Sequence, residues 1–181
     1  MKSKSAKDAK KAVQEIFGRV CAGGYNHRNQ FSGKLTLACP FFVPTERADD
    51  LALPHPARLP LGAAWRGLCA AAGHEREVPD NRELEGCNLG YATSCSRLPE
   101  DRKCDAVRLG VVKESGILIS LQLVYESRYR PAGHESLEYD KRTGGPPVPR
   151  GLGKDRSSSH LDPTIQRQAE CFLQTYLGRR D

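Results

Sequence analysis

The sequence predicts an α+β fold: a small antiparallel sheet packed by an N-terminal and a C-terminal helix, with a loop-rich cysteine region between them. The sheet is predicted from two runs of alternating apolar residues, Val107–Val111 and Ile117–Tyr125, which Glu114-Ser115-Gly116 separates. We therefore expect a hairpin at about residues 106–126. The two helices are predicted from apolar residues that recur at helical spacing near each end of the chain.

Start and stop signals define both predicted helices. For the first, over about residues 6–22, Ser5 and Asp8 form a capping-box pattern, and a glycine pair follows the last apolar residue. For the second, Asp162 is the expected N-cap and Pro163 lies in the first turn, where its missing N–H is not needed. The apolar stripe of this closing helix consists of Ile165, Ala169, Phe172, Leu173, Tyr176 and Leu177.

The segment before the hairpin is predicted to contain little regular structure. Five prolines between residues 40 and 60 predict an ordered loop there, preceded by a short strand at 35–39. Apolar spacing predicts a short helix over 63–72, and one helical turn over 80–85 that a glycine ends. A tight turn is expected to follow at Cys87–Tyr91.

The remaining segments complete the expected organisation of the chain. Residues 134–139 are predicted to add a third strand to the hairpin. Residues 141–161 are rich in Gly, Pro and Ser and are predicted to form a flexible linker before the closing helix. A length of 181 residues suits one domain, so we expect residues 1–181 to fold as a single domain with a cysteine-rich, metal-binding region at 39–104.

The charge balance limits the class of partner. The chain has 28 basic and 22 acidic residues and a net charge of +6. This charge permits an acidic partner such as nucleic acid, but the mixture of signs does not favour one. No apolar run approaches the roughly 20 residues of a membrane span, and the basic N-terminus lacks the apolar stretch of a secretory signal. We therefore expect a cytoplasmic protein with no membrane partner.

Seven cysteines are the feature of the composition that indicates a chemistry. Their number is odd and the expected compartment is reducing, so metal or thiol chemistry is favoured over a disulfide framework. Five of the seven lie between residues 39 and 104. The cysteines are Cys21, Cys39, Cys69, Cys87, Cys95, Cys104 and Cys171.

Four of these cysteines are predicted to bind a metal: Cys39, Cys69, Cys87 and Cys95. Each lies near a Gly or Pro, which lets the backbone turn sharply and approach a metal core. Zinc sites usually use paired C-x2-4-C knuckles, whereas the closest pair here has seven residues between its members. Some iron–sulfur sites take isolated cysteines, so a [4Fe-4S] cluster is expected, with zinc as the alternative. Cysteines that only fill space in the core are the third interpretation.

The other cysteines and two histidines receive lesser roles. Cys104 is expected to be exposed, because Lys103 and Asp105 flank it, and it remains a candidate to replace one of the four ligands. The others are interpreted as structural or loop-packing residues: Cys21, Cys171, His55 and His160.

Three classes of function are favoured by the sequence over a fourth, an enzyme acting on a small substrate. The first is a metalloprotein whose cluster serves electron transfer, redox sensing or loop stabilisation, with an unidentified redox or protein partner. The second is a basic nucleic-acid-binding module with a structural zinc, suggested by lysines near the N-terminus and by Arg128 and Arg130 flanking Tyr129. The third is an interaction domain with no metal. No phosphate-binding or hydrolase motif indicates an enzyme.

Overall fold

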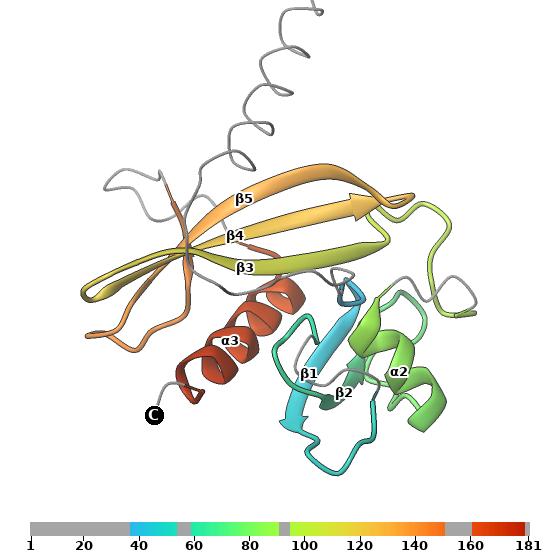
Figure 1. The fold of residues 1–181 in the computed structure, drawn as a ribbon. Coiled ribbons are helices and arrows are strands. Elements are labelled where there is room, and N and C mark those ends of the chain that lie inside the picture. The colour runs from blue at the N-terminus through green and yellow to red at the C-terminus, as the bar shows by residue number, and fades with distance from the viewer. Residues whose placement is uncertain (1–36, 54–58, 91–94, 151–160, 180–181) are drawn as a thin grey trace, which may run out of the picture. The chain divides into compact units, whose positions relative to one another are not determined.

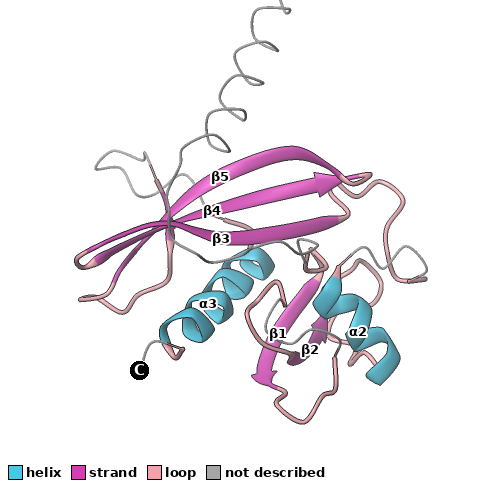
Figure 2. Cartoon of the chain, viewed as in Figure 1, coloured by secondary structure: helices cyan, strands magenta, loops and turns pink. Residues whose placement is uncertain are grey.

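The computed structural model describes residues 37–53, 59–90, 95–150 and 161–179 (Figure 1). It contains two antiparallel sheets and two helices, which confirms a mixed α+β fold (Figure 2). The expected helix over 6–22 lies outside the described residues, as do Cys21, His55 and His160, so the single domain over residues 1–181 stays a prediction. The elements are β1 (Phe42–Arg47), β2 (Trp65–Cys69), α2 (Asn81–Leu89), β3 (Ala106–Ser115), β4 (Leu118–Ser127), β5 (Arg130–Asp140), β6 (Val148–Pro149) and α3 (Pro163–Leu177).

The larger sheet has the strand order β3-β4-β5-β6. Strands β3 and β4 form the predicted hairpin, with Val107 opposite Tyr125 and Ser115 opposite Leu118. The third strand is also confirmed, and β5 is longer than the 134–139 expected. Within the segment expected as a linker, β6 pairs with the end of β5. Alternating side chains of these strands enter the main core, among them Val107, Leu109, Ile119, Leu121, Leu123 and Leu137.

The smaller sheet corrects the prediction of an irregular loop over residues 40–60. Strand β1 forms there and contains Pro44, which pairs with Gly67 of β2. A proline has no N–H to donate, but a sheet of only two strands consists of edges, where such a gap is tolerated. Next to this position the register shifts, between Pro44 and Glu46. Pro44 therefore does not prevent β1, and it lies at an irregularity of the pairing.

The prediction of a short helix over 63–72 is wrong, because strand β2 forms there. Gly67 explains why this segment pairs closely with β1. A Cβ atom built on Gly67 would lie 2.2 Å from the Val43 carbonyl oxygen and 2.7 Å from the Phe42 ring. The closeness of the two strands depends on this missing side chain, and apolar spacing alone gave no sign of it.

Helix α2 begins where it was predicted but is longer. Asp80 is its N-cap: the Asp80 side chain accepts hydrogen bonds from the backbone of Arg82 and Glu83, and Glu83 completes a capping box. The helix continues through Gly86 and ends at Gly90, so the tight turn predicted at Cys87–Tyr91 is wrong in its described part, and Cys87 is helical. Before β1, the described residues 37–39 form only an isolated bridge, between Ala38 and Val107, in place of the strand expected at 35–39.

Helix α3 has the predicted start, with the Asp162 side chain accepting hydrogen bonds from two backbone N–H groups of the first turn. In Figure 1 this helix lies beside β1 and below the larger sheet, and its apolar residues belong to the same core as those of β3, β4 and β5. The fully buried Gln168 side chain donates hydrogen bonds to the carbonyl oxygens of Cys39 and Phe42, at 2.8 and 2.7 Å. Helix α3 therefore fixes the backbone on both sides of the turn that leads into β1.

A tight turn joins strands β4 and β5, and the Asp105 side chain binds the backbone of this turn. The Asp105 carboxylate accepts a hydrogen bond from the backbone N–H of Arg128 at 2.7 Å and forms an ion pair with Arg102 at 2.6 Å. The Arg128 N–H, with Arg102 in addition, lowers the pKa of the Asp105 carboxyl. The ionised form of Asp105 therefore stabilises the native state.

Asp105→Asn should lower the free energy of unfolding at neutral pH by about 1 kcal/mol, because the carboxylate contacts are weakened. The native pKa is below the unfolded one, so this stabilisation is present above the unfolded pKa of about 3.9 and is lost as pH falls through the native pKa. Urea unfolding from neutral pH down to about pH 2.5 would show the wild type and the variant converging. The exposed Asp101→Asn should change nothing, and a constant difference across pH would contradict this role for Asp105.

Candidate metal centre

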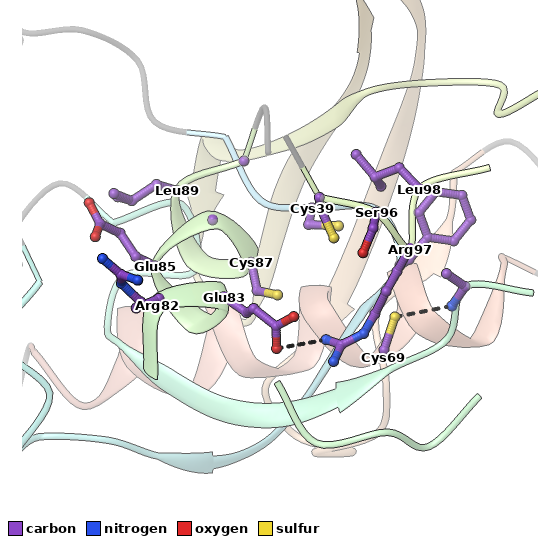
Figure 3. Close-up of a pocket in the computed structure, with 15 residues that line it drawn as sticks. Cys39, Cys69, Arg82, Glu83, Glu85, Cys87, Leu89, Ser96, Arg97 and Leu98 are labelled. Atoms are coloured by element: carbon purple, nitrogen blue, oxygen red, sulfur yellow. Dashed lines mark hydrogen bonds and ion pairs between the residues drawn. The ribbon is translucent and has the colours of Figure 1, made fainter. Parts of the chain in front are cut away.

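The four cysteines singled out from the sequence line one pocket of about 540 Å³. They come from four different segments: Cys39 precedes β1, Cys69 ends β2, Cys87 lies in α2 and Cys95 follows α2. Figure 3 shows the sulfur atoms of Cys39, Cys69 and Cys87 turned toward a common space. The fold therefore places side chains that are far apart in the chain around a single cavity.

Backbone contacts hold these segments together at the pocket. The Cys39 N–H donates to the Cys87 carbonyl oxygen at 3.0 Å, which joins the turn before β1 to helix α2. After β2, the Ala70 N–H donates to the Phe41 carbonyl oxygen at 2.8 Å. The next N–H, of Ala71, points at the Cys69 sulfur at 3.4 Å (Figure 3). One backbone donor, the Ala71 N–H, is thus directed at a sulfur of the pocket.

Asn88, which the sequence did not single out, connects α2 to β2. Its side chain is fully buried, and its oxygen accepts a hydrogen bond from the Trp65 N–H at 2.9 Å. Its amide nitrogen donates to the carbonyl oxygens of Trp65 and Leu84, at 3.0 and 2.9 Å. Asn88 thereby sets the position of the neighbouring Cys87 relative to the strand that ends at Cys69. An asparagine inside a helix carries no local pattern that would have revealed this role.

Gly90 allows the end of α2 to approach the segment before β1. Its φ is +66°, in the left-handed region that favours glycine. A Cβ atom built on Gly90 would lie 2.0 Å from the Leu37 carbonyl oxygen. The distance between the segments of Cys39 and Cys87 therefore depends on the absence of a side chain at this position.

Burial favours the neutral thiol at Cys39, Cys69 and Cys87. Burial raises the pKa of the Cys39 thiol to about 12, and negative charge on Cys69 or Cys95 would raise it further. Burial also raises the pKa of Cys87, with Cys39, Cys95 and Cys69 as the next causes, and burial raises the pKa of Cys69. Mutual repulsion of this kind arises when several thiols face one cavity, and a bound cation reverses it by stabilising the thiolates.

Arg97 is the other residue at the pocket that sequence reasoning missed. Its guanidinium forms ion pairs with Glu77 at 3.0 Å and with Glu83 at 2.9 Å, and its side chain is only 16% exposed. Glu77 follows β2, Glu83 lies on α2 and Arg97 lies two residues after Cys95. These ion pairs therefore join the three segments that carry Cys69, Cys87 and Cys95.

Arg97→Gln should lower the free energy of unfolding by about 1 kcal/mol, because it removes two charge-assisted contacts from a largely buried side chain. Urea unfolding would measure this loss. The matched control is Arg142→Gln, since Arg142 is 67% exposed and pairs with Asp140 of the same hairpin end. If the free energy of unfolding falls by the same small amount in both variants, Arg97 does not hold the segments together.

The remaining cysteines of the described chain, Cys104 and Cys171, are buried in the core. Cys104 is 8% exposed and belongs to the main core, so the expectation that it is exposed is wrong. The neighbouring Asp105 points instead to Arg102 and to the Arg128 backbone. Cys171 is fully buried on α3. Neither Cys104 nor Cys171 lines the pocket of the four cysteines.

The pocket is not a finished metal site. Within the described residues, no three His, Cys, Asp or Glu side chains are grouped closely enough to hold a metal ion as they stand. Lining a common cavity is a weaker condition than coordination, because a single zinc ion needs its sulfur ligands about 2.3 Å away. A metal centre here requires the cysteine side chains to turn further toward the cavity.

Comparison with known proteins gives no match: no family model, no curated protein and no solved structure is significantly similar to the chain. In the part of the chain that the structure describes, no helix is long and apolar enough to cross a membrane. The chemistry of the pocket is therefore inferred from its own residues.

Proposed function

We propose that the protein is a metalloprotein in which Cys39, Cys69, Cys87 and Cys95 bind a [4Fe-4S] cluster. The observation that supports this proposal is that four isolated cysteines from four segments line the same pocket. Such a centre would serve electron transfer, redox sensing or stabilisation of the segments that it joins. The partner would be a redox protein or another protein that contacts the pocket.

The size and lining of the pocket favour a cluster over a single zinc ion. A volume of about 540 Å³ is larger than the space that one tetrahedral ion leaves between its ligands. Apolar side chains also line the cavity, including Phe41, Leu89 and Leu98. Shielding from water and N–H donors near the sulfurs are the features with which proteins tune iron–sulfur clusters, and the Ala71 N–H supplies one such donor.

The test is to purify the whole chain without oxygen and to measure iron, sulfide, zinc and visible absorbance. We expect a broad absorbance near about 400 nm with roughly four irons and four sulfides per chain. Replacing any one of the four cysteines by serine should remove most of the bound iron. Cys171→Ser and Cys104→Ser are the controls, because these buried cysteines do not line the pocket. Both variants should retain the bound iron.

Each other result has a definite meaning. One zinc per chain without colour would replace the cluster by a structural zinc held in the same pocket. Iron that survives all four single substitutions would move the centre to other residues. No metal in any preparation would leave the four cysteines as packing residues and would overturn the proposal.

A further inference from the structure

The turn between β4 and β5 has an unusual backbone for its residues. Ser127 pairs with Arg130, so only Arg128 and Tyr129 form the turn. Their φ angles are +50° and +61°, in the left-handed region. Two-residue hairpin turns of this kind strongly prefer Asn-Gly or similar pairs, and a non-glycine residue there carries backbone strain. The protein keeps two large side chains at a position where small residues fold more easily.

The surrounding structure holds this strained turn in place. The Asp105 carboxylate binds the Arg128 N–H, and Arg102 binds both Asp105 and, at 2.9 Å, the Pro99 carbonyl oxygen. The consequence is an aromatic ring presented to solvent, since Tyr129 is 71% exposed. Figure 1 shows the turn at the end of the sheet next to the start of β3.

Positive charges flank the exposed ring. Arg128 and Arg130 are both exposed, and so is Lys103, which lies three residues before β3. The ion pairs within the described residues engage neither the Arg128 nor the Arg130 guanidinium. The carboxylates closest along the paired strands are already engaged: Asp105 by Arg102 and the turn, and Glu126 by Arg108.

We infer that this surface, the β4–β5 tip formed by Arg128, Tyr129 and Arg130, binds single-stranded nucleic acid. An exposed tyrosine between two arginines offers a stacking face for one unpaired base and two cations for the adjacent phosphates. The strain of the turn fits a binding role, because strained backbone that the surrounding structure maintains is often found at functional sites. The four-cysteine pocket is lined by other residues, so the inference does not depend on the proposed metal centre.

The test is fluorescence anisotropy of the full chain with labelled single-stranded oligonucleotides, one of DNA and one of RNA. Tyr129→Ala should weaken binding roughly ten-fold, whereas Tyr129→Phe should retain most of it, because the ring still stacks. Arg128→Gln and Arg130→Gln should each reduce the slope of log affinity against log salt by about 0.7. The control is Lys113→Gln, which removes the same charge from the opposite end of the β3–β4 hairpin and should have little effect.

A double variant separates binding from folding. Arg128→Asn with Tyr129→Gly gives the turn its preferred sequence, so the melting temperature should stay the same or rise by about 2–4 °C while binding is lost. The inference is overturned if the wild type binds neither oligonucleotide. It is also overturned if the tip variants bind no more weakly than Lys113→Gln, or if only anionic lipid vesicles bind at Tyr129.

Discussion

Asn88→Ala should be among the most destabilising single substitutions in the described part of the chain, lowering the free energy of unfolding by about 3 kcal/mol or more. The reason is that one side chain satisfies three buried backbone groups, the N–H and carbonyl of Trp65 and the carbonyl of Leu84. An unpaired buried polar group costs about 1–3 kcal/mol. Urea unfolding of the metal-free chain measures the loss.

Two companion variants test whether the hydrogen bonds of Asn88 are the cause. Asn81→Ala removes an exposed asparagine from the start of the same helix and should change stability little. Asn88→Asp keeps the volume but places an oxygen against two carbonyl oxygens, so it should destabilise at least as much as Asn88→Ala. A mild effect of Asn88→Asp would show that packing, and not hydrogen bonding, holds α2 to β2. Iron content should fall in both Asn88 variants, because Cys87 would lose its position relative to Cys69.

Gly90→Ala is expected to lower the free energy of unfolding by about 3 kcal/mol. It should also remove most of the metal that the proposed centre binds. The Gly90 backbone, with a φ of +66° and a ψ of 178°, strains an alanine by about 1–3 kcal/mol, and the clash of its Cβ with the Leu37 carbonyl oxygen adds the cost of overpacking. The clash can be relieved only by moving the segment of Cys39 away from the end of α2. Chemical unfolding and iron content measured on the same preparations would detect both effects.

Gly144→Ala is the matched control for Gly90→Ala. Gly144 has a similar positive φ, +61° against +66°, but nothing lies within 4 Å of a Cβ atom built there. It should therefore show the conformational cost alone, about 1 kcal/mol, with the metal content unchanged. Equal losses at the two glycines would mean that the contact with Leu37 does not determine the approach of the two segments.

The parts of the fold that the sequence predicted depend on local signals. Alternating apolar residues were enough for β3 and β4, and the Asp162-Pro163 start was enough for α3. Strand β2 was missed because it depends on a distant partner: only next to β1 does the missing side chain of Gly67 matter. The length of α2 was missed because Gly86 was interpreted as a helix end, whereas the helix continues for three residues after Gly86 and Asn88 contacts β2 from this last part.

The sequence identified which cysteines share the pocket, but not the residues that support them; the metal chemistry stays a prediction. The four cysteines were selected by their concentration and their Gly and Pro neighbours, and they line one pocket. Cys104 was misjudged because charged neighbours suggested exposure, although Asp105 is turned toward Arg102 while Cys104 enters the core. Asn88, Arg97 and Gln168 act through partners in other segments, and no pattern in the sequence marks such contacts.

The hydrogen bonds of Gln168 have a consequence for the order in which the proposed cluster and the chain are made. Gln168 holds the carbonyl of Cys39 across a separation of 129 residues. When synthesis has just passed Cys95, the nascent chain already contains all four thiols. It still lacks helix α3, which fixes the backbone of Cys39. Iron delivery would therefore follow synthesis of α3, so a donor would meet a folded acceptor and not a growing polypeptide.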